Sequence, residues 1–107
     1  LVDCRVAIYV PSTVNVSEPT NNEKQVKSVI TQLAGLFGGA TATQAVGGWV
    51  CETGETVLEN GTIVYSFCTS EQLREKFAQI YEIAERIKID MSQEAVTLEI
   101  NGQVKFV

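Results

Sequence analysis

Strand-like and helix-like hydrophobic patterns follow one another along this chain in the order strand, helix, strand, strand, helix, strand. Residues 4–10, CRVAIYV, alternate their side chains with the period of two that marks a strand. Residues 20–37 and 69–87 instead repeat apolar side chains every three or four positions, as amphipathic helices do. Residues 40–68 and 96–107 return to strands. This order predicts an α+β fold, a ferredoxin-like βαββαβ sandwich with an extra C-terminal edge strand and two helices on one face of an antiparallel sheet.

Capping residues set the expected ends of the first helix. Thr20 and Glu23 have the spacing of a capping box, and Pro19 blocks helix formation before them. Gly38, the first of two consecutive glycines, is expected to end the helix. The apolar side chains between these limits share one helical face, which indicates packing against a sheet. They are Val26, Val29, Ile30, Leu33, Leu36 and Phe37.

The second helix is expected to begin at Thr69 or Ser70, since both residue types are good helix caps. Glu, Lys, Arg and Gln side chains lie opposite its apolar stripe. The stripe consists of Leu73, Phe77, Ile80, Tyr81, Ala84 and Ile87.

Asn-Gly and Thr-Gly motifs divide the strand segments. Residues 52–55, ETGE, are expected to form a tight turn whose glycine has a positive φ. The Asn-Gly pair at 60–61 predicts either a β-bulge or a second hairpin turn, and we favour the bulge because residues 63–68 continue as a strong strand. The Asn-Gly pair at 101–102 predicts a hairpin between the last two strands.

The composition limits the classes of function. The chain has 107 residues, 45% of them hydrophobic, which fits a single domain over residues 1–107 with one core. No apolar run approaches the roughly 18–20 residues of a membrane span, so no membrane partner is expected. The net charge of −5 disfavours nucleic-acid binding, because an acidic surface repels phosphates, but it suits a basic protein partner.

Histidine is absent, which excludes imidazole acid–base catalysis and most zinc or haem sites. Cys4, Cys51 and Cys68 match no zinc or redox motif, and an odd number of cysteines is a poor disulfide framework. We therefore expect no cofactor, no metal site and a cytoplasmic location. The first residue is Leu1 rather than methionine, and LVDC loosely resembles a lipoprotein cleavage site, so trimming and lipidation are alternatives.

The strand over residues 63–68 is apolar on both faces, whereas two helices can cover only one face of a sheet. Ile63, Tyr65 and Phe67 alternate with Val64 and Cys68. We expect either self-association, as a homodimer, or a protein partner on the open sheet face. The alternative is that the long polar loop over residues 11–20 partly covers this face.

The most distinctive stretch, residues 47–61, holds the only tryptophan, Trp49. Its structural interpretation is a hairpin in which the indole packs and its N–H finds a partner. Its functional interpretation is a pocket or contact surface lined by Trp49, Glu52, Glu55 and Glu59, to which neighbouring strands add Tyr9 and Tyr65. Glu55 and Glu59 are four residues apart, so a regular strand would place both carboxylates on one face, where they could hold a cation or a basic side chain.

The spacing W-x4-G-x4-E, from Trp49 through Gly54 to Glu59, together with QEAV at residues 93–96, resembles a family of small bacterial and phage proteins with a ferredoxin-like plan. The resemblance covers roughly residues 5–107 in the order of elements, but its motifs are short. Ala95 stands where that family has serine, and the Asn-Gly pair at 60–61 is not part of its pattern. The family has no established activity, so the resemblance implies a fold and no mechanism.

Three hypotheses of function follow. The first is a small acidic interaction protein, of the phage or plasmid type, that binds a host or partner protein. The second is a small dimeric ferredoxin-like enzyme or ligand sensor that uses carboxylates in a pocket near Trp49. The third is a dimerising element of a longer chain. The absence of a catalytic constellation favours a binding protein over an enzyme.

Overall fold

A computed structural model describes residues 1–14 and 18–107 of the chain. Its helices are α1 (Glu23–Phe37) and α2 (Ser70–Asp90). Its strands are β1 (Cys4–Pro11), β2 (Thr13–Val14), β3 (Glu18–Pro19), β4 (Thr41–Val50), β5 (Thr56–Cys68), β6 (Thr97–Ile100) and β7 (Gln103–Phe106). Of the helices described, none combines the length and apolarity needed to cross a membrane.

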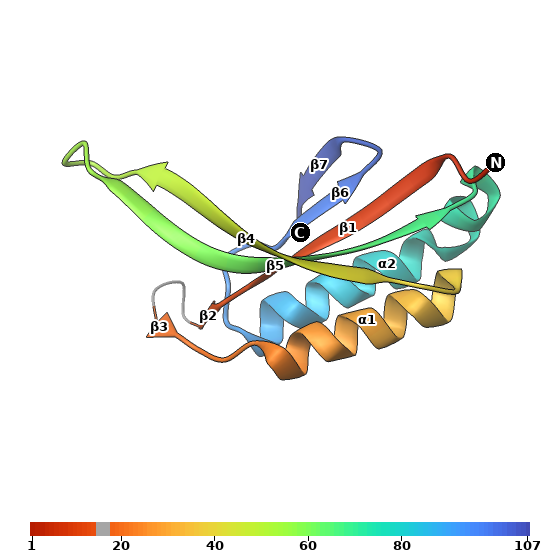
Figure 1. The fold of residues 1–107 in the computed structure, drawn as a ribbon, viewed down its shortest axis with the longest axis horizontal. Coiled ribbons are helices and arrows are strands. Elements are labelled where there is room, and N and C mark those ends of the chain that lie inside the picture. The colour runs from red at the N-terminus through yellow and green to blue at the C-terminus, as the bar shows by residue number, and fades with distance from the viewer. Residues whose placement is uncertain (15–17) are drawn as a thin grey trace.

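The main sheet has five antiparallel strands in the order β4-β5-β1-β6-β7, and both helices lie on one of its faces (Figure 1). The predicted α+β fold of ferredoxin-like type is therefore confirmed, with β7 as the extra edge strand. The short strands β2 and β3 pair with each other inside the segment predicted to be a loop. Residues 15–17 of that predicted loop lie outside the described residues.

The core lies between the sheet and the two helices. The alternation of β1 sends Val6, Ile8 and Val10 toward the helices, where each is fully buried. Val29 and Leu33 of α1 and a row of α2 residues meet them from the other side. The row from α2 consists of Ile80, Ile83, Ala84 and Ile87. Phe77 was predicted in the apolar stripe of this helix but is 44% exposed. Ile83 was not predicted there but is buried, because the face of α2 that contacts the core is broader than the predicted stripe.

The start of α1 differs from the predicted capping box. The N-cap is Asn22, whose side chain makes no capping hydrogen bond. Instead, Asn21 accepts a hydrogen bond from the backbone N–H of Glu23 at 2.9 Å. The backbone N–H of Thr20 is held by the carbonyl of Ser12, which keeps Thr20 outside the helix. Gly38 ends α1 with a φ of 94°, as predicted.

The predicted cap of α2 is confirmed and is more complete than predicted. Thr69 accepts a hydrogen bond from the backbone N–H of Gln72 at 3.1 Å, and the Gln72 side chain accepts one from the backbone N–H of Thr69 at 2.9 Å. Two otherwise unpaired backbone donors are thus satisfied at the helix entrance.

The predicted bulge at residues 60–61 is wrong. The ladder between β4 and β5 pairs residues one to one from Thr41 opposite Tyr65 to Val50 opposite Thr56, so no residue is inserted. Gly61 instead occurs where strands approach closely, since a Cβ there would lie 3.3 Å from the carbonyl oxygen of Val10. The turns predicted at residues 52–55 and 101–102 are present, with positive φ at Gly54, Asn101 and Gly102.

Candidate functional site

A cavity of about 430 Å³ lies beside the middle of the β4–β5 hairpin. The hairpin extends beyond the ends of β1 and β6 in this region (Figure 1). A cavity of this size lies in the range of small-molecule sites. Its lining comes from β1, β2, β4, β5 and β6 and from the segment that precedes β6. Residues that line it include Tyr9, Ala45, Glu59, Gly61, Gln93 and Thr97.

Strand register explains which side chains share this cavity. Tyr9 lies opposite Ile63, and Gly47 lies opposite Glu59, so all four belong to the sheet face that the helices do not cover. Gly47 has no side chain, and Ala45 pairs with another glycine. The small residues of β4 therefore leave space above the sheet, next to the carboxylate of Glu59.

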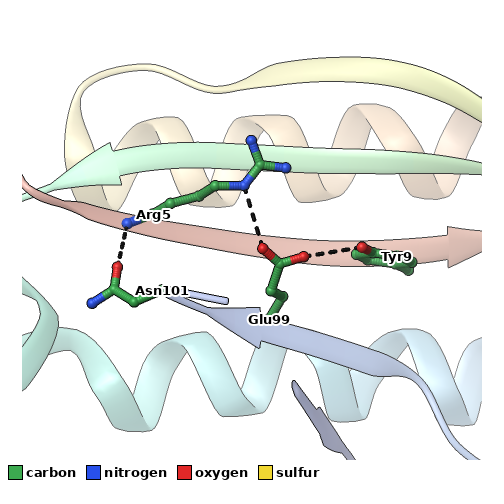
Figure 2. Close-up of polar contacts among 4 residues, drawn as sticks. All are labelled: Arg5, Tyr9, Glu99 and Asn101. Atoms are coloured by element: carbon green, nitrogen blue, oxygen red, sulfur yellow. Dashed lines mark hydrogen bonds and ion pairs between the residues drawn. The ribbon is translucent and has the colours of Figure 1, made fainter. Parts of the chain in front are cut away.

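Tyr9 belongs to a polar network on this open face (Figure 2). Its hydroxyl donates a hydrogen bond to Glu99 Oε1 at 3.0 Å, and Arg5 Nε lies 3.6 Å from Glu99 Oε2. The Arg5 guanidinium also lies 4.3 Å from the centre of the Tyr65 ring, a cation–π distance. The side chain of Asn101 accepts a hydrogen bond from the Arg5 backbone N–H at 2.8 Å. This network holds the phenol at the edge of the cavity.

The same network raises the pKa of Tyr9 above its ordinary value of 10.0. The hydrogen bond to Glu99 is the largest cause, because it binds the protonated phenol, and burial and the charge of Glu99 act in the same direction. Arg5 opposes the rise. At neutral pH Tyr9 is therefore a neutral hydroxyl that donates to Glu99 and keeps oxygen lone pairs free to accept.

Trp49 and Glu59 form a second polar contact on the open face. The indole N–H donates to Glu59 Oε1 at 3.2 Å, although the Trp49 side chain is 52% exposed. Trp49 does not line the cavity, whereas Glu59 does. The indole thus holds one carboxylate oxygen of Glu59 at the end of the cavity nearer the hairpin turn.

The other predicted site residues lie elsewhere. Glu52 and Glu55 belong to the turn at the tip of the hairpin and do not line the cavity. Because β5 begins at Thr56, Glu55 is not part of the regular strand that would have placed it beside Glu59. Tyr65 lies outside the cavity. Its ring forms an edge-to-face pair with Phe67, and the Arg5 guanidinium lies over it. Across the part of the chain that the structure describes, no group of three or more Asp, Glu or Cys side chains is arranged to hold a metal ion.

Sequence reasoning did not select Glu99, Arg5 or Gln93. Glu99 binds Tyr9 across the β1–β6 pair, and Gln93 lines the cavity while donating to the carbonyl of Thr13 at 2.7 Å. A polar residue in the middle of an alternating strand was the available signal for Glu99. Its partner could not be chosen without knowing that β6 lies next to β1.

No protein-family model matches the chain, and no curated protein sequence matches it. Solved structures do resemble it. A phage SAM lyase in complex with S-methyl-5'-thioadenosine is 23% identical, with a TM-score of 0.69, and the match covers 97% of this chain and 88% of that one. A phage SAM lyase in the apo state is 25% identical, with a TM-score of 0.66 and coverage of 97% and 85%.

CutA from Synechococcus elongatus is a more distant structural match. It is 12% identical, with a TM-score of 0.50 and coverage of 99% of this chain and 80% of that one. These matches place the whole described arrangement of strands and helices among known small α+β folds.

Proposed function

We propose that this protein binds an adenosyl sulfonium compound of the S-adenosylmethionine type in the cavity beside Tyr9 and Glu59, and that it cleaves this compound as a lyase. The observation that carries the proposal is the cavity itself: a hollow of about 430 Å³ with a carboxylate at one end, on a chain that matches phage SAM lyase along 97% of its length. This develops the hypothesis of an enzyme or ligand sensor with a carboxylate pocket near Trp49.

Charge complementarity supports a cationic ligand. S-adenosylmethionine carries a positive sulfonium and a positive ammonium group, and the chain has a net charge of −5. Glu59 presents a carboxylate oxygen to the cavity while the Trp49 indole engages the other side of the same group. A carboxylate that lines a concave surface can contact a cation from more than one side of the ligand together with its neighbours.

The lining also suits cleavage without a protein nucleophile. Its described residues include neither Lys nor Arg, so a ligand carboxylate bound there has no side-chain cation to neutralise it. That carboxylate can attack the γ-carbon of its own methionine part. A carbon–oxygen bond forms, the carbon–sulfur bond breaks, and its electron pair stays on sulfur. The products are a lactone and neutral S-methyl-5'-thioadenosine, with no proton transferred.

In this reaction the chain binds and orients its substrate rather than supplying a base. The cavity would hold the methionine part folded, with its carboxylate facing the γ-carbon. Holding the two reacting groups in this orientation lowers the entropic cost of the reaction. The apolar side chains of the lining, among them Ile63 and Ala45, favour loss of the sulfonium charge as the bond breaks. The neutral Tyr9 hydroxyl and Glu59 fix the orientation.

The test is incubation of the protein with S-adenosylmethionine and chromatographic detection of S-methyl-5'-thioadenosine and the lactone. Because Trp49 is the single tryptophan and contacts Glu59, its fluorescence provides an independent measure of binding. We expect product formation together with a saturable fluorescence change. A fluorescence change without product would reduce the proposal to a ligand sensor. Absence of both would overturn it.

Substitution of one carboxylate, with a matched control, tests the assigned cavity. Glu59→Gln keeps the shape of the side chain but removes its charge, and we expect affinity for the cationic ligand to fall by about tenfold or more. Glu55→Gln makes the same change at the hairpin tip, outside the cavity, and should leave affinity unchanged. Equal losses in both variants would point to a general charge effect instead of a site.

The open sheet face supports a second candidate function, self-association. Phe67, Val104 and Phe106 lie on the face away from the helices and are 56%, 52% and 72% exposed. Exposed apolar residues gathered on one sheet face favour an interface, and we propose a second copy of this chain as its occupant. Light scattering at several concentrations tests this. A mass that stays at 11.7 kDa would contradict it.

A further inference from the structure

Two cysteines that are far apart in sequence face each other across two strands. Cys4, the first residue of β1, is the register partner of Cys68, the last residue of β5. Both point to the helix-covered face, both are buried, at 5% and 1% exposure, and both are free thiols. No spacing rule in the sequence brings residues 4 and 68 together.

The backbone geometry of this pair is close to that of a disulfide. Directly opposed residues of antiparallel strands have Cα atoms about 4.5–5.5 Å apart, within the 4.4–6.8 Å range of disulfides. Their Cβ atoms are about 4.5–5.5 Å apart, whereas a disulfide needs roughly 3.5–4.5 Å. Cys4 is the first residue of β1 and follows the exposed residues Leu1 and Val2, so a small inward movement at this end of the strand can close the difference.

The two thiols also influence each other electrostatically, as expected for opposed residues on paired strands. The pKa of the Cys68 thiol is raised above its ordinary value of 9.0, first by burial, then by the charge on Cys4, then by the charge on Asp3. Asn101 donates a hydrogen bond to the Cys4 sulfur at 3.6 Å. Cys4 is thus held in place by an amide from the β6–β7 turn while Cys68 lies opposite it.

We infer that Cys4 and Cys68 form a redox-modification site that closes to an intramolecular disulfide when the protein meets a disulfide oxidant such as oxidised glutathione. The Cys4 thiolate, the less buried of the two, attacks one sulfur of the oxidant and releases one reduced glutathione, leaving a mixed disulfide. The Cys68 thiolate then displaces the second glutathione and forms the Cys4–Cys68 bond. Two protein thiols are oxidised, and one glutathione disulfide is reduced to two thiols.

The bond would connect the beginning of β1 to the residue just before the cap of α2. The closed loop would run from residue 4 to residue 68 and would contain α1 and the β4–β5 hairpin. A crosslink over so long a loop restricts the unfolded chain strongly. Closing the remaining Cβ distance introduces strain, and strained disulfides are reduced more readily, so the modification is reversible under a thiol reductant.

The experiment uses the Cys51→Ser variant, since Cys51 is the accessible thiol and would form disulfides between molecules. After incubation of the folded variant with oxidised glutathione, we expect both thiols to be lost and the mass to fall by about 2 Da, without bound glutathione. Peptide mapping should connect residues 4 and 68. The unfolding midpoint should rise by roughly 10 °C or more and return after reduction.

Two controls keep the inference falsifiable. Cys4→Ser in the Cys51→Ser background should show no mass loss and no shift of the midpoint. The native protein with Cys51 alkylated repeats the measurement in case the serine variant is unstable. Retention of both thiols in the folded protein, or pairing only after urea unfolding, would overturn the inference. So would a stable glutathione adduct on Cys4 that Cys68 never displaces.

Discussion

Glu59 and Glu99 are carboxylates on the same sheet face, and each is engaged by a different kind of donor. Glu59 accepts from an indole N–H, and Glu99 accepts from a phenol and lies beside a guanidinium. Glu99 is therefore largely committed to neighbours within the protein, whereas Glu59 keeps one carboxylate oxygen that no described side chain binds. For this reason the proposed cationic ligand is assigned to Glu59.

Replacing Tyr9 by phenylalanine tests the hydrogen bond at the cavity edge. Because the folded-state pKa of Tyr9 is raised above 10.0, its contribution to stability is fully present below about pH 10 and is lost as pH rises through the folded pKa. We expect Tyr9→Phe to lower the free energy of unfolding by at most about 1 kcal/mol at neutral pH.

The pH profile separates this effect from a packing defect. Urea unfolding of both proteins between neutral pH and about pH 11 should show the difference shrinking at the alkaline end, since ionised Tyr9 lies beside the Glu99 carboxylate. A difference that stays constant with pH would mean that the hydroxyl contributes through packing alone.

At the scale of elements, the two helix starts give a matched pair of threonines. Thr69 closes a capping box on α2, whereas Thr20 lies outside α1 even though its sequence spacing is similar. We expect Thr69→Ala to lower the free energy of unfolding by about 1 kcal/mol and Thr20→Ala to leave it almost unchanged. Chemical denaturation measures both, and a loss of similar size at Thr20 would contradict the cap described here.

Gly61 of β5 lies close to the backbone of β1. An added Cβ would meet the Val10 carbonyl oxygen at 3.3 Å, so Gly61→Ala must push β1 and β5 apart. We expect a loss of about 1–2 kcal/mol in the free energy of unfolding. Gly39→Ala is the control, since nothing lies within 4 Å of its added Cβ. Equal stability of the two variants would show that the strands can adjust.

These elements also show how far sequence patterns reach. The alternation of residues 4–10 and the stripe of α2 are local and periodic, so they predicted the strands, the helices and their order. The bulge at residues 60–61 was a wrong prediction because Asn-Gly is typical of turns, and only the close approach of the Val10 carbonyl to Gly61 shows why glycine occurs there. The partners of Tyr9 and Cys4 depend on which strands are neighbours, which local patterns do not contain.

At the scale of the whole molecule, the core and the hairpin tip differ in stability. The buried cluster joins β1, β5, β6 and both helices, but the outer half of the β4–β5 hairpin has no third strand beside it (Figure 1). An isolated two-stranded ribbon is only marginally stable. We expect backbone amides of residues 48–57 to exchange with deuterium far faster than those of Ile8 and Val64, in a native-state exchange experiment.

Slow exchange at the hairpin tip would contradict this expectation for a single chain and would indicate protection by a second copy. Slow exchange could come from the single chain itself or from a second copy that covers the tip. Measuring exchange at low and high protein concentration distinguishes these two causes, because only protection by a second copy depends on concentration.

The position of β4 at the edge of the sheet has a consequence for solubility. Its ten residues contain no charged side chain and no proline, and Val46, Trp49 and Val50 are exposed on it. Natural edge strands commonly carry a lysine or a proline as a gatekeeper against strand-to-strand polymerisation, and β7, at the opposite edge, carries Lys105. In concentrated solution β4 is therefore the segment from which fibrillar aggregation would be expected to start, and a single lysine introduced there is the natural remedy.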